Sequence, residues 1–572
     1  MRLGMRTVGR SVTAAMLMAM PAFVFYSGIE SVVTTALYFL IGTSSIIAGL
    51  LLPGERSSRP ERILSAILLS ASFLFAGSYL QRIQPYPFSM TWSEGNHLWQ
   101  ASLFYGSGTG IPTAEISISN YVTPGLYGLR GVPFLFGIKS LSIYRAWEAV
   151  LWLVPPLVFS WAVSCWANIE RWRIWLFSLW GALFLAQGPV YAPLLLGGAV
   201  ALLAARDQRL HVQRAGMLIG NLIAGLARWT WMFTPGLWGM LVLGFRIRPE
   251  KTTSPPQWLS LAWDAVAVLS GAGLSQWLSY LITGHAPLTY FTTISHPLLW
   301  YRLLSNETYP PGIIRGLMLV AGPLVAALCV AAWSKRDRLN PWVVALTSLL
   351  TAGFALSGLV ISVKIGGGSN LHNLDMLLAT LVLLTGMSIA GRTVEELAAG
   401  WQRTVAWVGV LVLLALPVTQ VVNNIERLSL PDVAATNEAY ALLDAILQSV
   451  TPDEEVLFID QRQILVTENY PSLHWDPEFE QVELMDRALA SDDVYLADFY
   501  SQLRAERYRW IICDPQPMVY KGRSGPFGEE NDAWVTAVTI PLLETYQARY
   551  TLDDVGIWIM EPRTEVAPDG TR

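Results

Sequence analysis

Charged residues are scarce in this sequence. Only 14% of its 572 residues are Asp, Glu, Lys or Arg, whereas an average soluble domain holds about 25%. Hydrophobic residues make up 53% of the chain, and the mean hydropathy is +0.41. This composition excludes an ordinary soluble globular enzyme.

Cysteine is also rare, with only Cys165, Cys329 and Cys513 scattered along the chain. The sequence therefore predicts neither a disulfide framework nor a cysteine-based metal cluster. The first apolar run follows Arg2, Arg6 and Arg10 but lacks a clear small-residue cleavage site. We therefore expect a retained signal anchor rather than a cleaved signal peptide.

The two signs of charge are distributed unequally. Residues 1–421 contain 15 acidic and 27 basic residues, whereas residues 422–572 contain 28 acidic and 11 basic residues. The first region alternates apolar runs with short Arg-rich connectors, which is typical of membrane-spanning helices. We predict a polytopic α-helical membrane domain over 1–421 and a small soluble domain over 422–572.

The apolar runs predict about thirteen membrane spans, although the runs at 192–205 and 214–227 are short for a perpendicular crossing. The predicted spans cover residues 12–29, 31–52, 63–80, 145–166, 174–190, 192–205, 214–227, 229–245, 258–283, 313–333, 341–362, 373–391 and 404–421.

If these spans alternate in direction, nineteen basic residues lie in the connectors on one side and eight on the other. The positive-inside rule makes the first side cytoplasmic. We therefore expect a multi-pass protein of the plasma (inner) membrane, with a cytoplasmic N-terminus and an extracytoplasmic C-terminal domain.

The C-terminal region has the pattern of a small α/β domain. A helix is predicted over 432–447, and β-rich runs follow at 455–459, 509–513 and 555–559. We expect this domain to cap the membrane site or to guide acceptors, without chemistry of its own.

Two long outer loops, 81–144 and 284–312, are the places where binding and chemistry are expected. In the first loop, Ser93 is a plausible N-cap of a short interfacial helix that begins at Glu94. A carboxylate at the positive end of such a helix can stay ionised and still accept a proton. Glu94 is thus a candidate catalytic base, and the plainer alternative is that it only helps to cap the helix.

Basic residues near the membrane surface are candidate phosphate ligands. Arg130 lies in a second amphipathic stretch of the first loop, Arg228 lies between two short spans, and Lys364 precedes three glycines. Guanidinium groups bind phosphate bidentately, and a glycine-rich turn lets backbone N–H groups approach an anion. The alternatives are a snorkelling Arg130, a structural partner for Arg228 and a merely flexible connector after Lys364.

The second outer loop, 284–312, is rich in aromatic residues and contains His285, His296 and Arg302. It suggests another interfacial helix near a site. Each single histidine is more often a satisfied polar group than an acid or base.

These segments, in this order and on one face, resemble the multi-pass glycosyltransferases of the GT-C class. That class includes the protein O-mannosyltransferases and the aminoarabinose transferases that act on lipid A. The resemblance covers residues 80 to 420. Its motifs are Ser93-Glu94-Gly95, Asn120-Tyr121-Val122-Thr123-Pro124, Leu226-Ala227-Arg228-Trp229-Thr230 and Lys364-Ile365-Gly366-Gly367-Gly368-Ser369-Asn370.

The resemblance implies an inverting transfer of a sugar from a polyprenyl-phosphate donor to an acceptor hydroxyl on a protein, lipid or glycan. Glu94 would be the general base. The departing phosphate would be stabilised by Arg228 and Lys364, with Arg130 and Arg302 as further candidates. The remaining expected substrate contacts are His97, Asn120, Tyr121, Asn370 and His372. The sequence lacks a DxD motif and indicates no cofactor, although a divalent metal is possible.

Two other classes of function remain open at this point. A secondary transporter would place ionisable residues near the membrane midplane, but Glu148 and Asp375 lie near the outer ends of their spans and only Asp264 lies deeper. A non-catalytic scaffold or sensor would tolerate replacement of Glu94. Neither alternative accounts for the long interfacial loops, and no nucleic-acid partner is expected.

Overall fold

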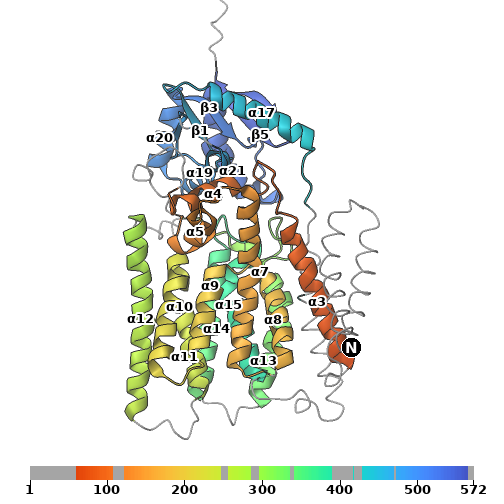
Figure 1. The fold of residues 1–572 in the computed structure, drawn as a ribbon, viewed down its shortest axis with the longest axis vertical. Coiled ribbons are helices and arrows are strands. Elements are labelled where there is room, and N and C mark those ends of the chain that lie inside the picture. The colour runs from red at the N-terminus through yellow and green to blue at the C-terminus, as the bar shows by residue number, and fades with distance from the viewer. Residues whose placement is uncertain are drawn as a thin grey trace, which may run out of the picture.

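The protein consists of a helical bundle with a small mixed domain stacked on one end (Figure 1). The structure, a computed structural model, describes residues 59–106, 121–169, 171–246, 255–284, 296–334, 341–389, 417, 428–468, 470 and 472–563. Residues 428–563 are called the C-terminal domain below, and the end of the bundle that it covers is called the domain-facing end.

The bundle helices match the predicted apolar runs. They are α3 (Arg59–Leu80), α7 (Leu141–Trp166), α8 (Arg171–Ala186), α9 (Ala192–Ala204), α10 (Leu210–Ala227), α11 (Thr234–Arg246), α12 (Pro255–Thr283), α13 (Ile313–Ser334), α14 (Pro341–Ser362) and α15 (Asp375–Ile389). Each coincides with a span predicted from the sequence. The runs at 12–29, 31–52 and 404–421, and the domain boundary after residue 421, fall outside the described residues.

Length and composition support a membrane-embedded bundle. Within the described part of the chain, five helices are long and apolar enough to cross a membrane: α7, α12, α13, α14 and α15. The apolar stretches of α3, α8 and α9 are shorter, and α9 corresponds to the short predicted run at 192–205.

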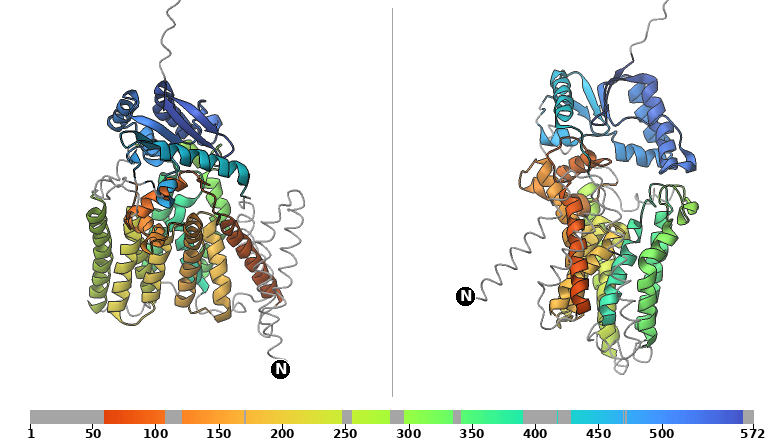
Figure 2. Two further views of the ribbon diagram at one scale, coloured as in Figure 1. Left: turned by 45° about the horizontal axis from the view of Figure 1, so that its top comes forward. Right: turned by 90° about the vertical axis from the view of Figure 1, so that its right-hand side faces the viewer.

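Helix α15 lies inside the bundle, and most of its residues are buried. It packs against α7 and α8 on one side and against α13 and α14 on the other, which gives the layered arrangement visible in Figure 2. Helices α9 and α10 approach closely at two glycines. A Cβ on Gly220 would lie 2.6 Å from the carbonyl oxygen of Gly197.

Three short helices lie between the bundle and the C-terminal domain. They are α4 (Glu94–Leu103), α5 (Pro124–Arg130) and α6 (Val132–Leu135). The predicted interfacial helix after Ser93 is therefore present, and the second amphipathic stretch is divided between α5 and α6. Three 3₁₀ segments lie between bundle helices at this domain-facing end. They are η1 (Trp229–Trp231), η4 (Trp300–Leu303) and η6 (His372–Leu374).

The C-terminal domain has the predicted α/β composition. Its helices include α17 (Val433–Ser449), α18 (Gln463–Thr467), α19 (Gln481–Ala490), α20 (Asp493–Arg504), α21 (Gly528–Trp534) and α22 (Ile540–Thr545). The strands are β1 (Glu455–Phe458), β2 (His474–Asp476), β3 (Tyr508–Cys513), β4 (Tyr546–Leu552) and β5 (Ile557–Pro562), in the order β2-β1-β3-β5-β4. Strand β1 pairs in parallel with β2 and β3, and β5 pairs antiparallel with β3 and β4.

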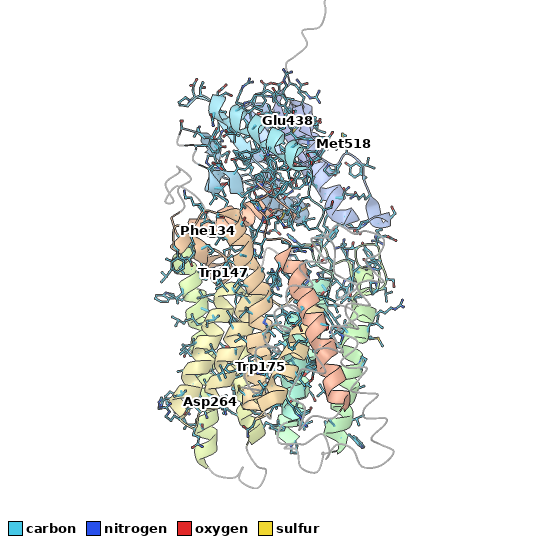
Figure 3. The ribbon with its side chains drawn as sticks, turned by 45° about the vertical axis from the view of Figure 1, so that its right-hand side comes forward. Phe134, Trp147, Trp175, Asp264, Glu438 and Met518 are labelled. Carbon is cyan, nitrogen blue, oxygen red and sulfur yellow. The ribbon has the colours of Figure 1, made fainter. Side chains whose placement is uncertain are left out.

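The acidic residue that a transporter would most need has a partner in the bundle. Asp264 on α12 accepts a hydrogen bond from Nε of Arg214 on α10 at 2.9 Å. Figure 3 places Asp264 near the end of the bundle away from the C-terminal domain, whereas Trp147 and Phe134 lie at the domain-facing end. Within α12, Asp264 is thus already held in an ion pair with a neighbouring helix.

Candidate functional site

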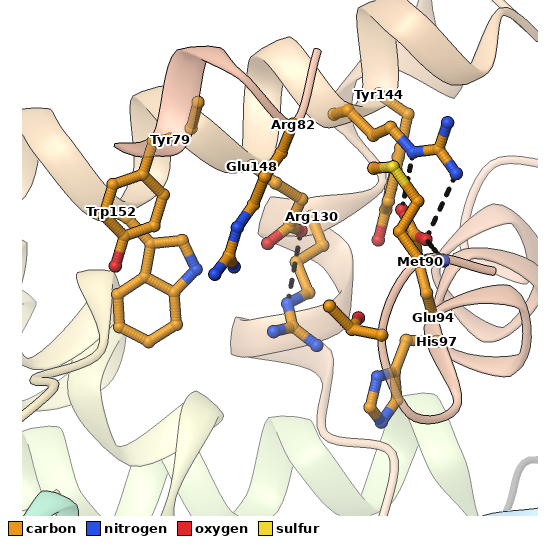
Figure 4. Close-up of a pocket in the computed structure, with 12 residues that line it drawn as sticks. Tyr79, Arg82, Met90, Glu94, His97, Arg130, Tyr144, Glu148 and Trp152 are labelled. Atoms are coloured by element: carbon orange, nitrogen blue, oxygen red, sulfur yellow. Dashed lines mark hydrogen bonds and ion pairs between the residues drawn. The ribbon is translucent and has the colours of Figure 1, made fainter. Parts of the chain in front are cut away.

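A cavity of about 150 Å³ opens at the domain-facing end of the bundle (Figure 4). Four segments that are distant in sequence line it: the end of α3, the loop into α4 with α4 itself, α5, and the first half of α7. The lining residues are Tyr79, Arg82, Met90, Thr91, Glu94, His97, Arg130, Tyr144, Arg145, Glu148, Ala149 and Trp152. Three predicted site residues, Glu94, His97 and Arg130, are among them.

Glu94 is held by a two-pronged ion pair. Nε of Arg145 donates to Oε1 at 2.8 Å and Nη2 donates to Oε2 at 3.2 Å, while the backbone N–H of Met90 donates to Oε2 at 2.7 Å. The same guanidinium also donates to the backbone carbonyls of Gln84, Tyr86 and Phe88. The carboxylate is therefore fixed in orientation at the wall of the cavity, and Arg145 ties it to the loop that precedes α4.

Ser93 lies at the predicted N-cap position of α4. Its φ is 57°, however, and its side chain makes no capping hydrogen bond. The cap comes instead from Ser89, whose hydroxyl accepts a hydrogen bond from the N–H of Gly95 at 3.1 Å. A left-handed non-glycine residue is strained, and this strain is located directly before Glu94.

Two arginines in the cavity differ in how their charge is balanced. Arg130 pairs with Glu148 on α7 at 3.3 Å. Arg82 lies over the ring of Tyr79 at 5.6 Å and has no acidic partner among the described residues. In Figure 4 its guanidinium extends into the cavity between Trp152 and the Arg130–Glu148 pair.

The cavity lining carries a net positive charge. Three arginines face two glutamates. Burial, reinforced by the nearby charge of Arg130, lowers the pKa of His97 to about 3, so this histidine is neutral at neutral pH. The excess positive charge is therefore that of Arg82, and it suits a bound anion.

A second group of predicted site residues surrounds the end of α10. Arg228 forms an ion pair with Asp375 at 3.7 Å and lies over the ring of Trp231 at 5.3 Å. On the chain before α15, the backbone N–H and Nδ1 of His372 lie 2.8 and 2.7 Å from Oδ1 of Asn370. The sequence allowed Arg228 to have a structural partner without identifying it, and that partner is Asp375.

Lys364 lies in the glycine-rich turn next to this second group. Its backbone forms an isolated antiparallel bridge with Leu298. Burial lowers the pKa of the Lys364 ammonium, Asp486 of the C-terminal domain opposes this effect, and Arg228 adds to it. The positive charges of Lys364 and Arg228 are thus close enough to influence each other.

A row of aromatic rings connects the two groups. Trp152 of the cavity lies 5.4 Å from Tyr191, and Tyr191 lies 6.0 Å from Trp231, the residue beneath Arg228. The cavity and the Arg228 group are therefore parts of one continuous region at the domain-facing end of the bundle.

Arg302 lies between the glycine-rich turn and the C-terminal domain. It is fully buried and donates to Glu530 at 2.7 Å through both Nη atoms and to Glu529 at 3.1 Å. Two carboxylates of the C-terminal domain already balance its charge, so Arg302 serves the contact between domains rather than the cavity.

The remaining predicted contacts lie at the edge of this region or outside it. The ring of Tyr121 packs edge-on against His97 and Tyr127, at 6.5 and 5.9 Å. Asn120 falls outside the described residues, as do His285 and the neighbouring part of the second outer loop. His296 is described and buried, and Asp486 lies 3.8 Å from its Nε2.

Three charged residues of the cavity were not singled out as site residues from the sequence: Arg82, Arg145 and Glu148. Arg82 lies two residues after the end of α3, and the other two lie about one helical turn apart near the start of α7. Charged residues at the ends of apolar runs are the available signal, but many such residues only snorkel to the membrane surface. Their convergence depends on the tertiary fold.

Within the described ranges, no group of three or more His, Cys, Asp or Glu side chains is arranged to hold a metal ion. The polar groups in the cavity are arginines, glutamates and one neutral histidine.

Comparison with known proteins places the fold beside one set of solved structures. The crystal structure of ArnT from Cupriavidus metallidurans bound to undecaprenyl phosphate has a TM-score of 0.44 and 12% sequence identity, with 88% of this chain and 98% of that chain covered. The apo-state structure of the same protein has a TM-score of 0.45 and 13% identity, with 87% and 97% covered. No family model and no curated protein matches the sequence.

Proposed function

We propose that this protein is a GT-C-type glycosyltransferase that moves a sugar from a polyprenyl-phosphate donor to an acceptor hydroxyl. The observation that carries the proposal is the cavity itself, in which the oriented carboxylate of Glu94 lines the same space as the guanidinium of Arg82, which has no acidic partner among the described residues. A base and an anion site are the two groups that such a transfer needs.

In the proposed reaction the acceptor oxygen attacks the anomeric carbon of the sugar, and the bond from that carbon to the phosphate oxygen breaks. Glu94 takes the proton of the attacking hydroxyl. The polyprenyl phosphate leaves with the electron pair of the broken bond, and attack from the opposite face inverts the anomeric centre. A positioned general base accelerates such a step by roughly 10²–10⁴-fold.

The charge that develops on the departing phosphate requires cations. Arg82 is the first candidate because no acidic side chain in the described part of the chain pairs with it. Arg228 and Lys364 remain proposed phosphate ligands, with His97, Tyr121, Asn370 and His372 as neighbouring polar contacts. Arg130 contributes through its pair with Glu148. No step of this scheme is assigned to a metal or cofactor.

We further propose that the cavity and the C-terminal domain lie on the extracytoplasmic face of a plasma (inner) membrane. The support is the excess of arginine and lysine in the connectors of the opposite side. A polyprenyl donor would then approach with its headgroup at the domain-facing end and its chain along the bundle.

The alternatives from other classes are less well supported. The transporter hypothesis relied on Asp264, which pairs with Arg214 near the far end of the bundle. A scaffold or sensor gives no reason to build a cavity lined by five charged side chains beneath a separate domain.

The test is sugar transfer in membranes that contain the wild-type protein or the Glu94→Gln variant at equal level. The donors are undecaprenyl-phosphate-linked mannose, glucose, galactose and aminoarabinose, each radiolabelled in the sugar. We expect transfer from one donor by the wild type and at least a 100-fold loss in the variant, since glutamine keeps the shape but cannot accept the proton.

Ser102→Ala is the matched control, because it removes a bond within α4, from Oγ to the carbonyl of Trp99, without touching the cavity. This control should transfer at close to the wild-type rate. Equal transfer by wild type and Glu94→Gln would overturn the assignment of Glu94 as base.

A further inference from the structure

The carboxyl ends of the parallel strands of the C-terminal sheet face the bundle. From β1 the chain passes through α18 to β2 on one side, and from β2 through α19 and α20 to β3 on the other side of β1. In open α/β sheets, the carboxyl ends of strands at such a reversal form the usual place for a ligand. Here the residues that follow β1 are Ile459 to Arg462.

The loop and helix that carry Glu94 contact the segment that follows β1. Nδ2 of the buried Asn96 donates to the carbonyl of Ile459 at 2.9 Å. The backbone N–H of Ser89 donates to Oε1 of Gln461 at 2.9 Å, and Nε2 of Gln463 donates to the carbonyl of Pro87 at 3.0 Å. Three hydrogen bonds thus connect both ends of this loop to three residues of one segment of the C-terminal domain.

Aromatic packing strengthens the same contact. The guanidinium of Arg462 lies between Trp99 of α4, at 4.7 Å, and Trp475 of β2, at 5.4 Å. It also donates to the carbonyls of Phe458 and Pro477, and it is fully buried. Trp99 and Trp475 belong to one hydrophobic cluster that continues from α4 into the sheet. The contact is therefore part of the protein core.

The C-terminal domain also contacts Gly95, the residue that follows Glu94. A Cβ on Gly95 would lie 3.0 Å from the backbone nitrogen of Arg462 and would collide with the side chain of Gln463. Only a glycine lets the C-terminal domain approach α4 this closely. The strained φ of 57° at Ser93, on the other side of Glu94, also needs surroundings that hold it in place.

From this geometry we infer that the C-terminal domain positions Glu94, with Asn96 and Gln463 as positioning residues that act through the start of α4. The inference rests on the proposed function for the role of Glu94. The domain expected to act only as a cap or an acceptor guide is, on this inference, part of the catalytic apparatus.

The test uses the purified full-length protein with Asn96→Asp and Gln463→Met. Asn96→Asp keeps the shape of the side chain but places a carboxylate against the carbonyl of Ile459, and Gln463→Met removes the donor to Pro87. One variant changes the contact in α4 and the other changes it in the C-terminal domain. If one of them fails to fold, the other still tests the contact. Ser102→Ala is again the control within α4, and Glu94→Gln is measured in parallel.

Two quantities are measured, transfer from the best donor of the panel and amide hydrogen exchange of Glu94–Leu103. We expect both variants to keep cooperative thermal unfolding, to lower kcat at least tenfold with the KM for the donor unchanged, and to exchange faster in α4 than the control. Folded variants with kcat within twofold of wild type would overturn the inference, while loss of activity in Glu94→Gln would leave the proposed function standing.

If Glu94→Gln transfers the sugar at the wild-type rate, the proposed function is wrong in assigning Glu94 as the general base. Amide hydrogen exchange of Glu94–Leu103 is then the measurement that tests whether the C-terminal domain holds α4 in place. Unchanged exchange in both positioning variants shows that the C-terminal domain does not hold α4, and faster exchange shows that it does.

Discussion

Arg82 differs from the other two arginines of the cavity in having no acidic partner within the described ranges. Replacing it by glutamine should weaken the binding of undecaprenyl phosphate by about 10- to 100-fold, since a charge-assisted hydrogen bond contributes about 1.5–3 kcal/mol. Replacing Glu148 by glutamine should have the opposite effect. It removes a negative charge near the anion and should tighten binding several-fold.

Both changes are measured by titrating detergent-solubilised protein with undecaprenyl phosphate and following the thermal midpoint, which a bound ligand raises. Arg209→Gln is the control, because Arg209 forms an exposed pair with Asp207 just before α10, far from the cavity in the sequence. Equal binding by Arg82→Gln and wild type would show that the anion site lies elsewhere, with Arg228 and Lys364 as the next positions to test.

His97 makes the stability of the protein depend on pH. Its pKa is lowered to about 3 by burial and by Arg130, whereas in the unfolded chain it is about 6.5. The unfolded state therefore binds a proton first as the pH falls. The contribution of His97 to the free energy of unfolding is therefore fully present above pH 6.5 and is lost as the pH falls from 6.5 to 3. Up to about 2 kcal/mol is lost by pH 5.

The expected result is a thermal midpoint that falls from pH 7.5 to pH 5 by more in the wild type than in His97→Gln, which cannot take up the proton. Other acidic groups contribute equally to both proteins, so the difference between the two curves isolates His97. Parallel curves would show that His97 does not resist protonation in the folded protein.

At the scale of the element, α5 depends on one glycine for its contact with the end of α10. A Cβ on Gly125 would lie 2.5 Å from the backbone nitrogen of Ala227 and 2.6 Å from the carbonyl carbon of Leu226. Because these are backbone atoms, Gly125→Ala must push the two helices apart beside Arg228. We expect a loss of about 1–3 kcal/mol and reduced transfer.

Gly128 provides a control in the same helix. A Cβ there would meet only the hydroxyl of Tyr105 at 3.9 Å, and alanine favours a helix by up to about 1 kcal/mol over glycine. Gly128→Ala should therefore be neutral or stabilising in thermal unfolding. Equal effects of the two substitutions would contradict the close contact of α5 with α10.

Elements that are encoded locally were predictable from the sequence, and those that depend on distant partners were not. Each bundle helix in the described ranges is marked by its own apolar run. Strand β2 has only three residues, and β4 alternates irregularly between buried and exposed positions, so neither has a clear local pattern. The helix cap from Ser89 and the ion pairs of Arg145 and Arg130 with Glu94 and Glu148 exist only once the loop and the helices have folded together.

At the scale of the whole molecule, two of the contacts that attach the C-terminal domain to the bundle involve buried polar groups near the proposed site. One is the contact of α4 with the carboxyl end of the parallel strands. The other is the buried Arg302, which pairs with Glu530 and Glu529 at the start of α21. Glu530 also accepts a hydrogen bond from the N–H of Gly366 at 2.7 Å. The second contact thus ties the C-terminal domain to the glycine-rich turn that contains Lys364.

This second contact predicts a specific order of stabilities. Glu530→Met leaves a buried guanidinium poorly compensated and should cost about 3 kcal/mol. The double variant Arg302→Met/Glu530→Met removes both charges and should cost less than the sum of the two single changes. Glu529→Gln alters a pair whose carboxylate is 20% exposed, so its cost should stay below about 1 kcal/mol.

Thermal unfolding and limited proteolysis of the full-length variants measure this order. Glu530→Met should also release Gly366 and so lower the affinity for undecaprenyl phosphate if Lys364 binds the phosphate, whereas Glu529→Gln should not. Additive costs for Arg302 and Glu530 would mean that the two side chains do not act as a pair. These measurements distinguish the two contacts between the domains. Loss of the Arg302–Glu530 contact should affect the turn that contains Lys364, whereas loss of the α4 contact should affect Glu94.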